Sequence, residues 1–454
     1  MRTLLRKVKA KLPLLAASFG LWLMLASIMG ASASYFDSEQ APASFTAFTS
    51  SRWTQTTRAD FLLDVRTNVD VDRHPGDVIL SGRTEFHYAF RGSNTRTFWR
   101  YNTSSTTWSA MANAPGALRD DGGALSSDGD RYIYALEGGN RQFWRYDVLS
   151  NSWSTLTRAP NNIRLGGGLA FDGNGGFYAL RGASNTAFWR YSVASDSWSV
   201  LANTPAQVSD GGCLVCDQKK FVYAMQGNEL SAFWRYNITS NSWTAMASLP
   251  RQVSYGGAMT YDGINSIYVL TGWSQSYFLR YNISGNTWST LTNIPSGVGY
   301  GGSLSFSYPG TLFAFSGGNT ARYWRYDIAT GIWSAGVSAP RNVGIGGALT
   351  NGPTVFYRSG TLLSQTFDTG KSGCRVQGLY WTEALVSGTD ITFEMRASDT
   401  LVSGAPSGSW VSLGGTSPVT SGLPSGRYLQ WRATITTSNV HLTPALQEVR
   451  VYYA

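Results

Sequence analysis

Cysteine, histidine and charged side chains are scarce in this sequence. Its 454 residues include three cysteines and three histidines, and only 14% are charged. Disulfides therefore do not hold the fold together. Glycine is abundant, with 50 residues, and 14% of the residues are aromatic. This combination argues against disorder, which requires few aromatics and a high charge, and suits many short strands joined by tight turns.

The formal net charge of +9 comes largely from the N-terminus. Five basic residues lie in the first eleven positions: Arg2, Arg6, Lys7, Lys9 and Lys11. Without them, 31 basic residues face 27 acidic ones, and the net charge falls to +4. The remainder contains no run of Lys or Arg, so we expect no nucleic-acid partner.

Residues 1–33 have the pattern of a signal peptide. A basic stretch precedes an apolar one at residues 12–29, and Ala31-Ser32-Ala33 fits a cleavage site of small residues. The alternative is an uncleaved membrane anchor, but a stretch of 18 residues is near the lower limit for crossing a bilayer. We favour cleavage, which predicts a secreted or cell-surface protein. If the segment is not cleaved, it is the only part through which we expect membrane contact.

Residues 34–75 form a separate N-terminal segment. Residues 34–39, followed by Phe45-Thr46-Ala47, resemble the start of exported bacterial matrix proteins of the camelysin type. The resemblance covers about a dozen residues and agrees with export.

A 45-residue repeat organises the centre of the chain, residues 76–358. Three residue types recur at this spacing in six copies. They are Tyr101, Tyr146, Tyr191, Tyr236, Tyr281 and Tyr326; Trp108, Trp153, Trp198, Trp243, Trp288 and Trp333; and Pro115, Pro160, Pro205, Pro250, Pro295 and Pro340. Chance does not give three residue types the same spacing five times over, so six similar structural units follow one another.

Each unit is predicted to contain four strands and no helix. In one copy the strands cover residues 122–125, 132–136, 143–148 and 153–156. Asp128-Gly129 suits a tight hairpin between the first two strands, because both residues tolerate positive φ. One sheet of this size cannot bury both of its faces, so the units must stack, and radial stacking gives a β-propeller.

The repeat resembles the kelch family. The resemblance is carried by a Tyr and a Trp with six residues between them, as in Tyr236 and Trp243, and by a Gly that ends the second strand, as in Gly227. The family usually has a double Gly at that point, which only Gly138-Gly139 and Gly317-Gly318 match. The resemblance covers about residues 76–358 and implies a kelch-type propeller.

The strand pattern leaves six or seven blades open. The strand that resembles Phe-Trp-Arg-Tyr occurs six times, but residues 76–80 and 346–349 both have the pattern of a first strand, which gives seven first strands. We predict six blades, with one terminal segment completing the first blade, because propeller rings often close with strands from both ends of the chain. Seven blades are the alternative.

Residues 359–454 are predicted to form an antiparallel β-sandwich. The period stops after Gly360, and alternating apolar and polar runs continue at residues 361–367, 379–383, 391–396, 428–434 and 449–453. Residues 426–433 resemble sandwich modules of exported bacterial proteins, which implies a binding or spacing role. If residues 61–71 also pair with this sandwich, the propeller is an insertion between its strands.

An arginine recurs at one position of every unit. The six residues are Arg100, Arg145, Arg190, Arg235, Arg280 and Arg325. One interpretation is a ring of cations that binds an anionic polymer. We prefer a structural interpretation, in which each guanidinium stacks on an aromatic ring of its own or the adjacent blade, because packing requires the same residue in every blade.

The loops between the fourth strand of one unit and the first strand of the next differ from unit to unit. They lead to the innermost strands, so they should surround the central channel, and variation between blades is where a specific site can arise. The candidate ligand-binding residues are Arg119, Asp120, Arg164, Asp210, Arg251, Tyr255, Tyr300 and Arg341, with Trp273 from a loop between second and third strands. Aromatic faces beside hydrogen-bonding groups suit a sugar or a peptide. The alternative is that these are ordinary solvated loop residues.

No metal or cofactor site is predicted. Cys213 and Cys216 have the spacing of a zinc half-site, but neither a second cysteine pair nor a nearby histidine follows. On a strand, residues three apart face opposite sides, so we expect buried thiols. The histidines, His74, His87 and His441, lie outside the recurring loops.

No catalytic residue is predicted either. Galactose oxidase also uses kelch-type blades, but the two histidines that bind its copper together with tyrosines have no counterpart in these loops. The Ser-x-Asp-x-Gly-x-Thr-Trp box of sialidases is also absent. Carboxylates of different blades, such as Asp120 and Asp210, could still form a catalytic pair.

These observations favour one function over two alternatives. The preferred hypothesis is an exported, monomeric, non-enzymatic protein that binds an extracellular carbohydrate or protein through the propeller loops. The first alternative is a secreted carbohydrate-active enzyme, a lyase or hydrolase, that uses carboxylates and tyrosines of the same face. The second is a matrix or surface structural protein. Fold alone does not decide between them.

Overall fold

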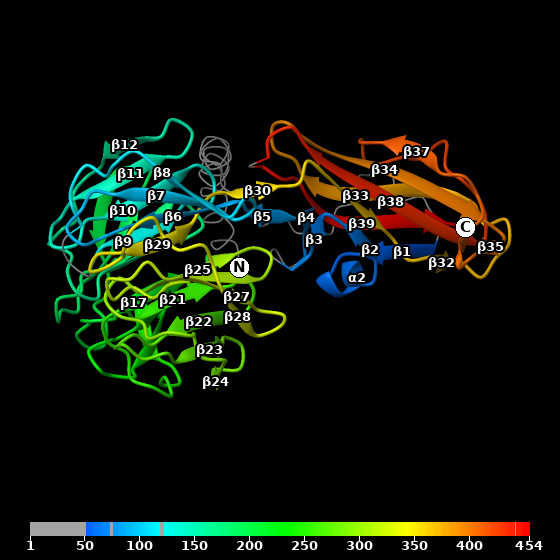
Figure 1. Ribbon diagram of the computed structural model, residues 1–454. Helices are drawn as coiled ribbons and strands as arrows, with labels where there is room; N and C mark the ends of the chain where they lie inside the picture. The colour runs from blue at the N-terminus through cyan, green and yellow to red at the C-terminus, as the bar shows by residue number, and fades with distance from the viewer. Residues whose placement is uncertain (1–50, 73–75, 119–121, 441) are drawn as a thin grey trace, which may run out of the picture. The chain divides into compact units, whose positions relative to one another are not determined.

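The computed structural model describes residues 51–454 except 73–75, 119–121 and 441 (Figure 1). The predicted signal peptide and the residues up to position 50 lie outside this part. The described residues are almost entirely β-structure, and their one helix, α2 (Arg58–Leu62), has five residues. No helix in the described part is long and apolar enough to cross a membrane. The predicted all-β fold is confirmed.

Six four-stranded antiparallel sheets correspond to the 45-residue units in the described chain. Five of them are formed by consecutive strands: β9 (Ala124–Ser127), β10 (Tyr132–Leu136), β11 (Phe143–Asp147), β12 (Ser152–Thr155); β13 (Gly168–Phe171), β14 (Gly176–Leu180), β15 (Phe188–Ser192), β16 (Ser197–Val200); β17 (Cys213–Cys216), β18 (Phe221–Met225), β19 (Phe233–Asn237), β20 (Ser242–Ala245); β21 (Ala258–Tyr261), β22 (Ser266–Leu270), β23 (Phe278–Asn282), β24 (Thr287–Thr290); and β25 (Ser303–Ser307), β26 (Thr311–Phe315), β27 (Tyr323–Asp327), β28 (Ile332–Ala335). The sixth combines β6 (Phe86–Phe90), β7 (Phe98–Asn102) and β8 (Thr107–Ala110) with β29 (Ala348–Asn351).

The six sheets close into a ring. The first strands β9, β13, β17, β21, β25 and β29 contact one another in this order, and β29 contacts β9. A cluster of buried side chains lies between neighbouring sheets. In one cluster Phe143 packs with Trp189 and Tyr191 of the next sheet. Trp144 and Tyr146 pack toward the preceding sheet instead, because successive side chains of a strand face opposite sides. The fold is therefore a β-propeller.

Strands from opposite ends of the repeat region close this ring. β29 lies antiparallel beside β6, with Leu349 opposite Ala89. Residues 76–80 are not part of the ring, because Val78–Leu80 form β4, which pairs with β3 (Val69–Asp70) and β39 (Ala445–Tyr453). The predicted propeller start at residue 76 is corrected accordingly. A short apolar run shows that a strand forms, but not which sheet it joins.

The repeated Trp and Tyr hold neighbouring sheets together by hydrogen bonds as well as by packing. In all six units the Trp indole N–H donates to a backbone carbonyl just after the fourth strand of the preceding unit; Trp243, for example, donates to Ala202 at 2.9 Å. The hydroxyl of Tyr236 donates to Asn241 Oδ1, which also accepts from the backbone N–H of Ala202. The turn residue Asn241 has φ of 49°, a conformation that Asn tolerates better than most residues.

Four of the six repeated arginines contact side chains of their own sheet, whereas Arg280 and Arg325 are exposed. Arg235 lies over the ring of Phe221 at 4.2 Å, and Arg100 and Arg145 stack in the same way on the first aromatic side chains of their second strands. Arg190 instead pairs with Asp172 at 2.5 Å. These contacts favour the structural interpretation over a ring of ligand-binding cations.

The remaining strands form a β-sandwich. They are β1 (Ser51–Gln55), β2 (Val65–Thr67), β3, β4, β31 (Ser359–Leu363), β32 (Phe367–Asp368), β33 (Val376–Ala384), β34 (Thr389–Ser398), β35 (Leu401–Val402), β36 (Ala405–Pro406), β37 (Val411–Gly414), β38 (Tyr428–Thr437) and β39. One sheet has the order β1-β39-β4-β3 with β33 beside β39, and the other has the order β2-β31-β38-β34-β37 with β32 beside β38. Trp381, Phe393 and Trp431 are buried between them.

The N-terminal strands belong to this sandwich (Figure 1). The blue strands β1–β4 lie among the orange and red C-terminal strands, and β2 pairs with β31 while β1 and β4 pair with β39. The propeller is thus inserted in the sequence between β4 and β31. A two-stranded ribbon of β5 (Gly82–Thr84) and β30 (Thr354–Phe356) joins the chain where it enters and leaves the propeller.

Acidification is expected to weaken the propeller at its closing interface. His87 is completely buried on β6, where its Nδ1 lies 3.1 Å from Ser305 Oγ and its ring packs on Phe313. Burial lowers the pKa of His87 from 6.5 to about 3. The unfolded chain therefore binds a proton that the folded chain does not, and stability should fall by up to ~1.4 kcal/mol per pH unit between about 6.5 and 3.

Denaturant unfolding of the wild type and His87→Gln at several pH values measures this effect. Asp64 is also buried, and burial raises its pKa to about 6. It acts in the opposite direction, because it makes the fold less stable as the pH rises from about 4 to 6. Both proteins share Asp64, so the difference between them isolates His87. Parallel pH profiles would show that His87 does not cause the acid sensitivity.

Replacing one repeated Arg should affect stability and leave binding intact. Arg235→Gln removes the contact with Phe221, and we expect the free energy of unfolding to fall by roughly 0.5–2 kcal/mol. Thermal unfolding checks the first part, and a binding assay on the same variant checks the second. Unchanged stability together with lost binding would support the ring of cations instead.

Candidate functional site

The loops that follow each repeated Pro are held tightly against the ring. Each enters its first strand through a double Gly, and Gly256 shows why Gly is needed there. Its φ is +80°, and a Cβ atom would lie 2.2 Å from the carbonyl oxygen of Gly299 in the next loop. Neighbouring loops thus touch through their backbones, which fixes the position of the residue just before each double Gly.

These preceding residues occur at 45-residue spacing beside the start of each first strand. In the described loops they are Leu165, Asp210, Tyr255, Tyr300 and Ile345. Tyr255 and Tyr300, from adjacent units, stack with ring centroids 4.4 Å apart and an interplanar angle of 18°. Tyr300 is 37% exposed and Tyr255 is half-buried. The loops therefore present a pair of stacked aromatic rings where the other described units carry aliphatic or acidic side chains.

Trp273 lies in the turn between β22 and β23, beside this pair. Its backbone N–H donates to the carbonyl of Tyr255 at 2.8 Å, and the next residue, Ser274, donates to Val298, two positions before Tyr300. The turn thus connects the two loops that carry the stacked tyrosines. Trp273 is half-buried and has φ of 56°, which is uncommon for a bulky residue.

Arg251 adds a cation to the same unit. Its guanidinium lies over the ring of Tyr277 with 4.5 Å between Cζ and the ring centroid. Tyr277 directly precedes β23, and Arg251 is exposed in the loop that carries Tyr255. We call Arg251, Tyr255, Trp273, Tyr277 and Tyr300 the aromatic cluster.

The other candidate residues are not part of this cluster. Arg164 and Arg341 are exposed in the loops before β13 and β29, and Asp210 is half-buried in the loop before β17. Arg119 and Asp120 lie outside the described residues, and so does the suggested carboxylate pair of Asp120 with Asp210.

Tyr277 is a member of the cluster that was not predicted from the sequence. The equivalent positions carry Thr97, Gln142, Ala187, Ala232 and Arg322, so an aromatic residue occurs there only once in the six units. The sequence therefore contains a signal at Tyr277, namely an aromatic residue where the repeat has none. Its significance is clear only from the contact with Arg251.

The central channel is narrow. It encloses a cavity of about 130 Å³ lined by the glycines and small or aliphatic residues that open the first strands, such as Gly167, Gly212 and Gly257. This volume corresponds to about four water molecules. A larger ligand would therefore contact the loops around the channel and not its interior.

A second cavity, of about 410 Å³, lies in the unit of β9–β12. Its lining includes Glu137, Gln142, Trp144 and Arg158. Glu137 is 7% exposed and directly follows β10, at a position where no other unit has an acidic residue; the equivalents are Arg91, Arg181, Gln226, Thr271 and Ser316. The Oε1 atom of Gln142 is buried without a hydrogen-bond partner. The cavity thus coincides with a departure from the repeat, since the loop between β10 and β11 is one residue shorter than its counterparts.

The cysteines lie where the strand pattern predicts. Cys216 is buried and Cys213 half-buried at the two ends of β17, and burial raises the pKa of both thiols, to about 12 for Cys216. Among the described residues, no three His, Cys, Asp or Glu side chains are grouped closely enough to hold a metal ion. His87 is buried between two sheets, and His74 and His441 lie outside the described residues.

Comparison with known proteins identifies no family for this chain. No protein-family model matches the chain, and no curated protein matches it significantly. Two solved structures resemble part of it. TolB from Acinetobacter baumannii is 14% identical with a TM-score of 0.45, and the match covers 59% of this chain and 66% of TolB. A chain of a nidogen/laminin complex is 14% identical with a TM-score of 0.47, and the match covers 58% of this chain and 98% of that chain. At this level of similarity neither carries an argument about function, and the propeller assignment rests on the strand pairing.

Proposed function

We propose that this protein is an exported, non-enzymatic binding protein that recognises an extracellular carbohydrate or protein. The aromatic cluster is the proposed site, and the propeller, whose repeat we take to be of kelch type, is the platform that holds it. The export part rests on the signal-peptide pattern of residues 1–33.

The stacked pair of Tyr255 and Tyr300 is the observation that carries this proposal. The repeated Tyr and Trp pack between sheets in every unit, and four of the six repeated Arg contact side chains of their own sheet, as shared packing requires. Neither Tyr255 nor Tyr300 belongs to that set, and Tyr300 keeps 37% of its surface exposed. Packing between the sheets does not require these two aromatic residues, so they can take part in ligand binding.

The chemistry of the cluster suits both proposed ligand classes. The rings of Tyr and Trp offer apolar faces, and their hydroxyl and indole groups and the Arg251 guanidinium can hydrogen-bond. Such a combination matches the alternating apolar and polar faces of a sugar, or an aromatic or prolyl side chain of a protein. These rings are also rigid, so little conformational entropy is lost when they bind.

A glycan array and a protein pull-down with the full-length chain test the proposal. Tyr255→Ala and Tyr300→Ala should each weaken binding by about tenfold or more, because each removes one half of the stacked surface. Leu165→Ala is the matched control, since Leu165 occupies the same repeat position in another unit, and it should bind like the wild type.

The two screens separate the ligand classes. A signal on the array alone identifies a carbohydrate, and a captured protein that the tyrosine variants fail to capture identifies a protein partner. Wild-type binding by both tyrosine variants would rule out the aromatic cluster as the site.

A further inference from the structure

The outer face of one sandwich sheet carries an unusual set of side chains. In the sheet β2-β31-β38-β34-β37, alternate residues point into the core, such as Phe393 and Met395 on β34. The residues between them therefore face outward. On β34 these include Glu394 and Arg396, and Arg432 lies directly opposite Glu394 on β38.

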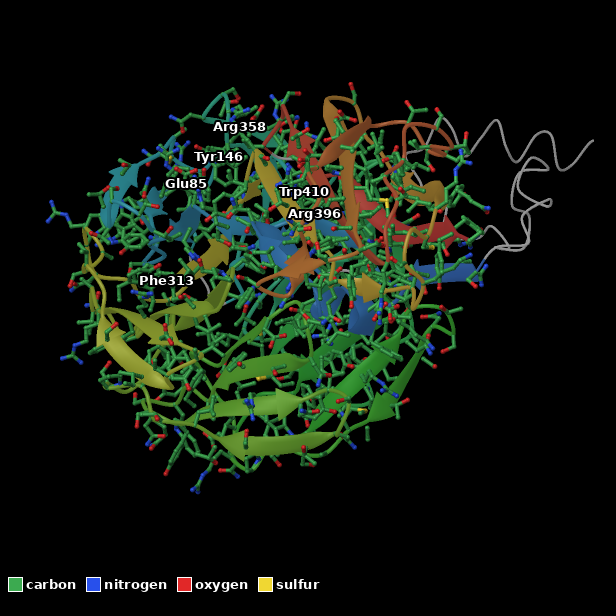
Figure 2. All side chains as sticks on the ribbon, turned by 90° about the vertical axis from the view of Figure 1, so that its right-hand side faces the viewer. Glu85, Tyr146, Phe313, Arg358, Arg396 and Trp410 are labelled. Carbon is green, nitrogen blue, oxygen red and sulfur yellow. The ribbon has the colours of Figure 1, made fainter. Side chains whose placement is uncertain are left out.

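Trp410 lies over two arginines of this face. It directly precedes β37, the edge strand that pairs with β34, so it is placed beside Arg396 (Figure 2). The Cζ atoms of Arg396 and Arg432 each lie 4.6 Å from the centroid of its ring. Two guanidiniums and one indole, half-buried, are thus gathered on a face that is otherwise mainly polar.

The charges in this group do not cancel. Arg432 forms an ion pair with Glu394. Arg396 donates from Nε and Nη2 to Gln430 Oε1, at 3.0 and 2.6 Å, and the amide carries no charge. Among the described residues Arg396 has no carboxylate within ion-pair distance. Burial and repulsion from Arg432 lower the pKa of Arg396, as expected for a cation that lacks a counter-charge.

An apolar path continues across the sheet from these arginines. Leu363 on β31 lies opposite Arg432, and Val65 on β2 lies opposite Leu363. Val65 is 65% exposed. From Trp410 to Val65 the outward side chains cross five strands, a distance of about 19 Å at ~4.8 Å per strand. The face can therefore contact an extended ligand along its length.

We propose that this face binds an acidic polysaccharide, with Arg396, Arg432 and Trp410 as the binding residues. The indole offers a flat surface to a sugar ring, and the guanidiniums pair with a carboxylate or sulfate of the chain. A path that crosses five strands suits a polymer better than a small anion. This site lies in the sandwich, apart from the aromatic cluster, and so it goes beyond the function proposed for the propeller.

Binding of the full-length protein to immobilised polymers tests this inference. Polygalacturonate tests carboxylate recognition, dextran sulfate tests sulfate recognition, and neutral dextran is the uncharged control. We expect binding to one or both acidic polymers, none to dextran, and a loss of affinity as NaCl rises from 0.05 to 0.5 M. Arg396→Gln and Trp410→Ala should each weaken binding at least fivefold.

Matched variants make the result interpretable. Arg52→Gln removes an exposed arginine of the other sandwich sheet and should bind like the wild type. Thermal unfolding shows whether Trp410→Ala still folds, and Arg396→Lys, which keeps the charge, should retain more binding than Arg396→Gln.

Several outcomes would overturn the inference. One is binding to neither acidic polymer, and another is equal binding to dextran. A third is wild-type affinity in folded Arg396→Gln, which would mean that the arginines and Trp410 only stabilise the sheet. Preference for anionic lipid vesicles over both polymers would indicate a membrane surface instead. Loss of polymer binding in Tyr255→Ala but not in Arg396→Gln would also overturn it, while leaving the proposed function of the propeller standing.

Discussion

Packing between adjacent sheets is the interaction on which the propeller depends. Each sheet has only four short strands and two apolar faces, so it is stable only between two neighbours. The strand of Phe-Trp-Arg-Tyr type supplies both faces, because Phe143 contacts the next sheet while Trp144 and Tyr146 contact the preceding one. An open row of such sheets would expose an apolar face to solvent at each end. Closing the ring through β29 and β6 buries both of these faces.

This dependence divides the residues of the repeat into two groups. Residues that recur in every unit, such as Trp243 with its hydrogen bond to Ala202, serve the contact between sheets. Residues that occur in one or two units and lie outside the buried clusters between sheets do not serve this contact. Tyr255, Tyr300 and Glu137 belong to this second group, and they lie at the aromatic cluster and at the larger cavity. Substitutions at these positions should therefore leave the ring intact.

The sequence was sufficient to predict the parts of the fold that repeat. The spacing of Tyr, Trp and Pro predicted the four-stranded units, because each unit must solve the same packing problem. Residues 76–80 show the limit of this reasoning, since the apolar run of β4 fits a propeller strand and a sandwich strand equally well. Only pairing with β3 and β39, a contact between distant parts of the chain, decides between them.

The candidate sites were less accessible from the sequence. The loops that hold Tyr255 and Tyr300 could be selected because they vary, but their stacking depends on how adjacent loops pack. The group of Arg396, Trp410 and Arg432 gave no sequence signal. Its members come from different positions along the chain, and only the pairing of β34 with β37 and β38 brings them together.

Hydrogen exchange of the amides in β29 tests the closure of the ring most directly. If Ala348–Asn351 pair with β6 as the account requires, their amides should exchange as slowly as those of β9, β13, β17, β21 and β25. Fast exchange in β29, with slow exchange in the other five first strands, would show that this strand does not close the ring.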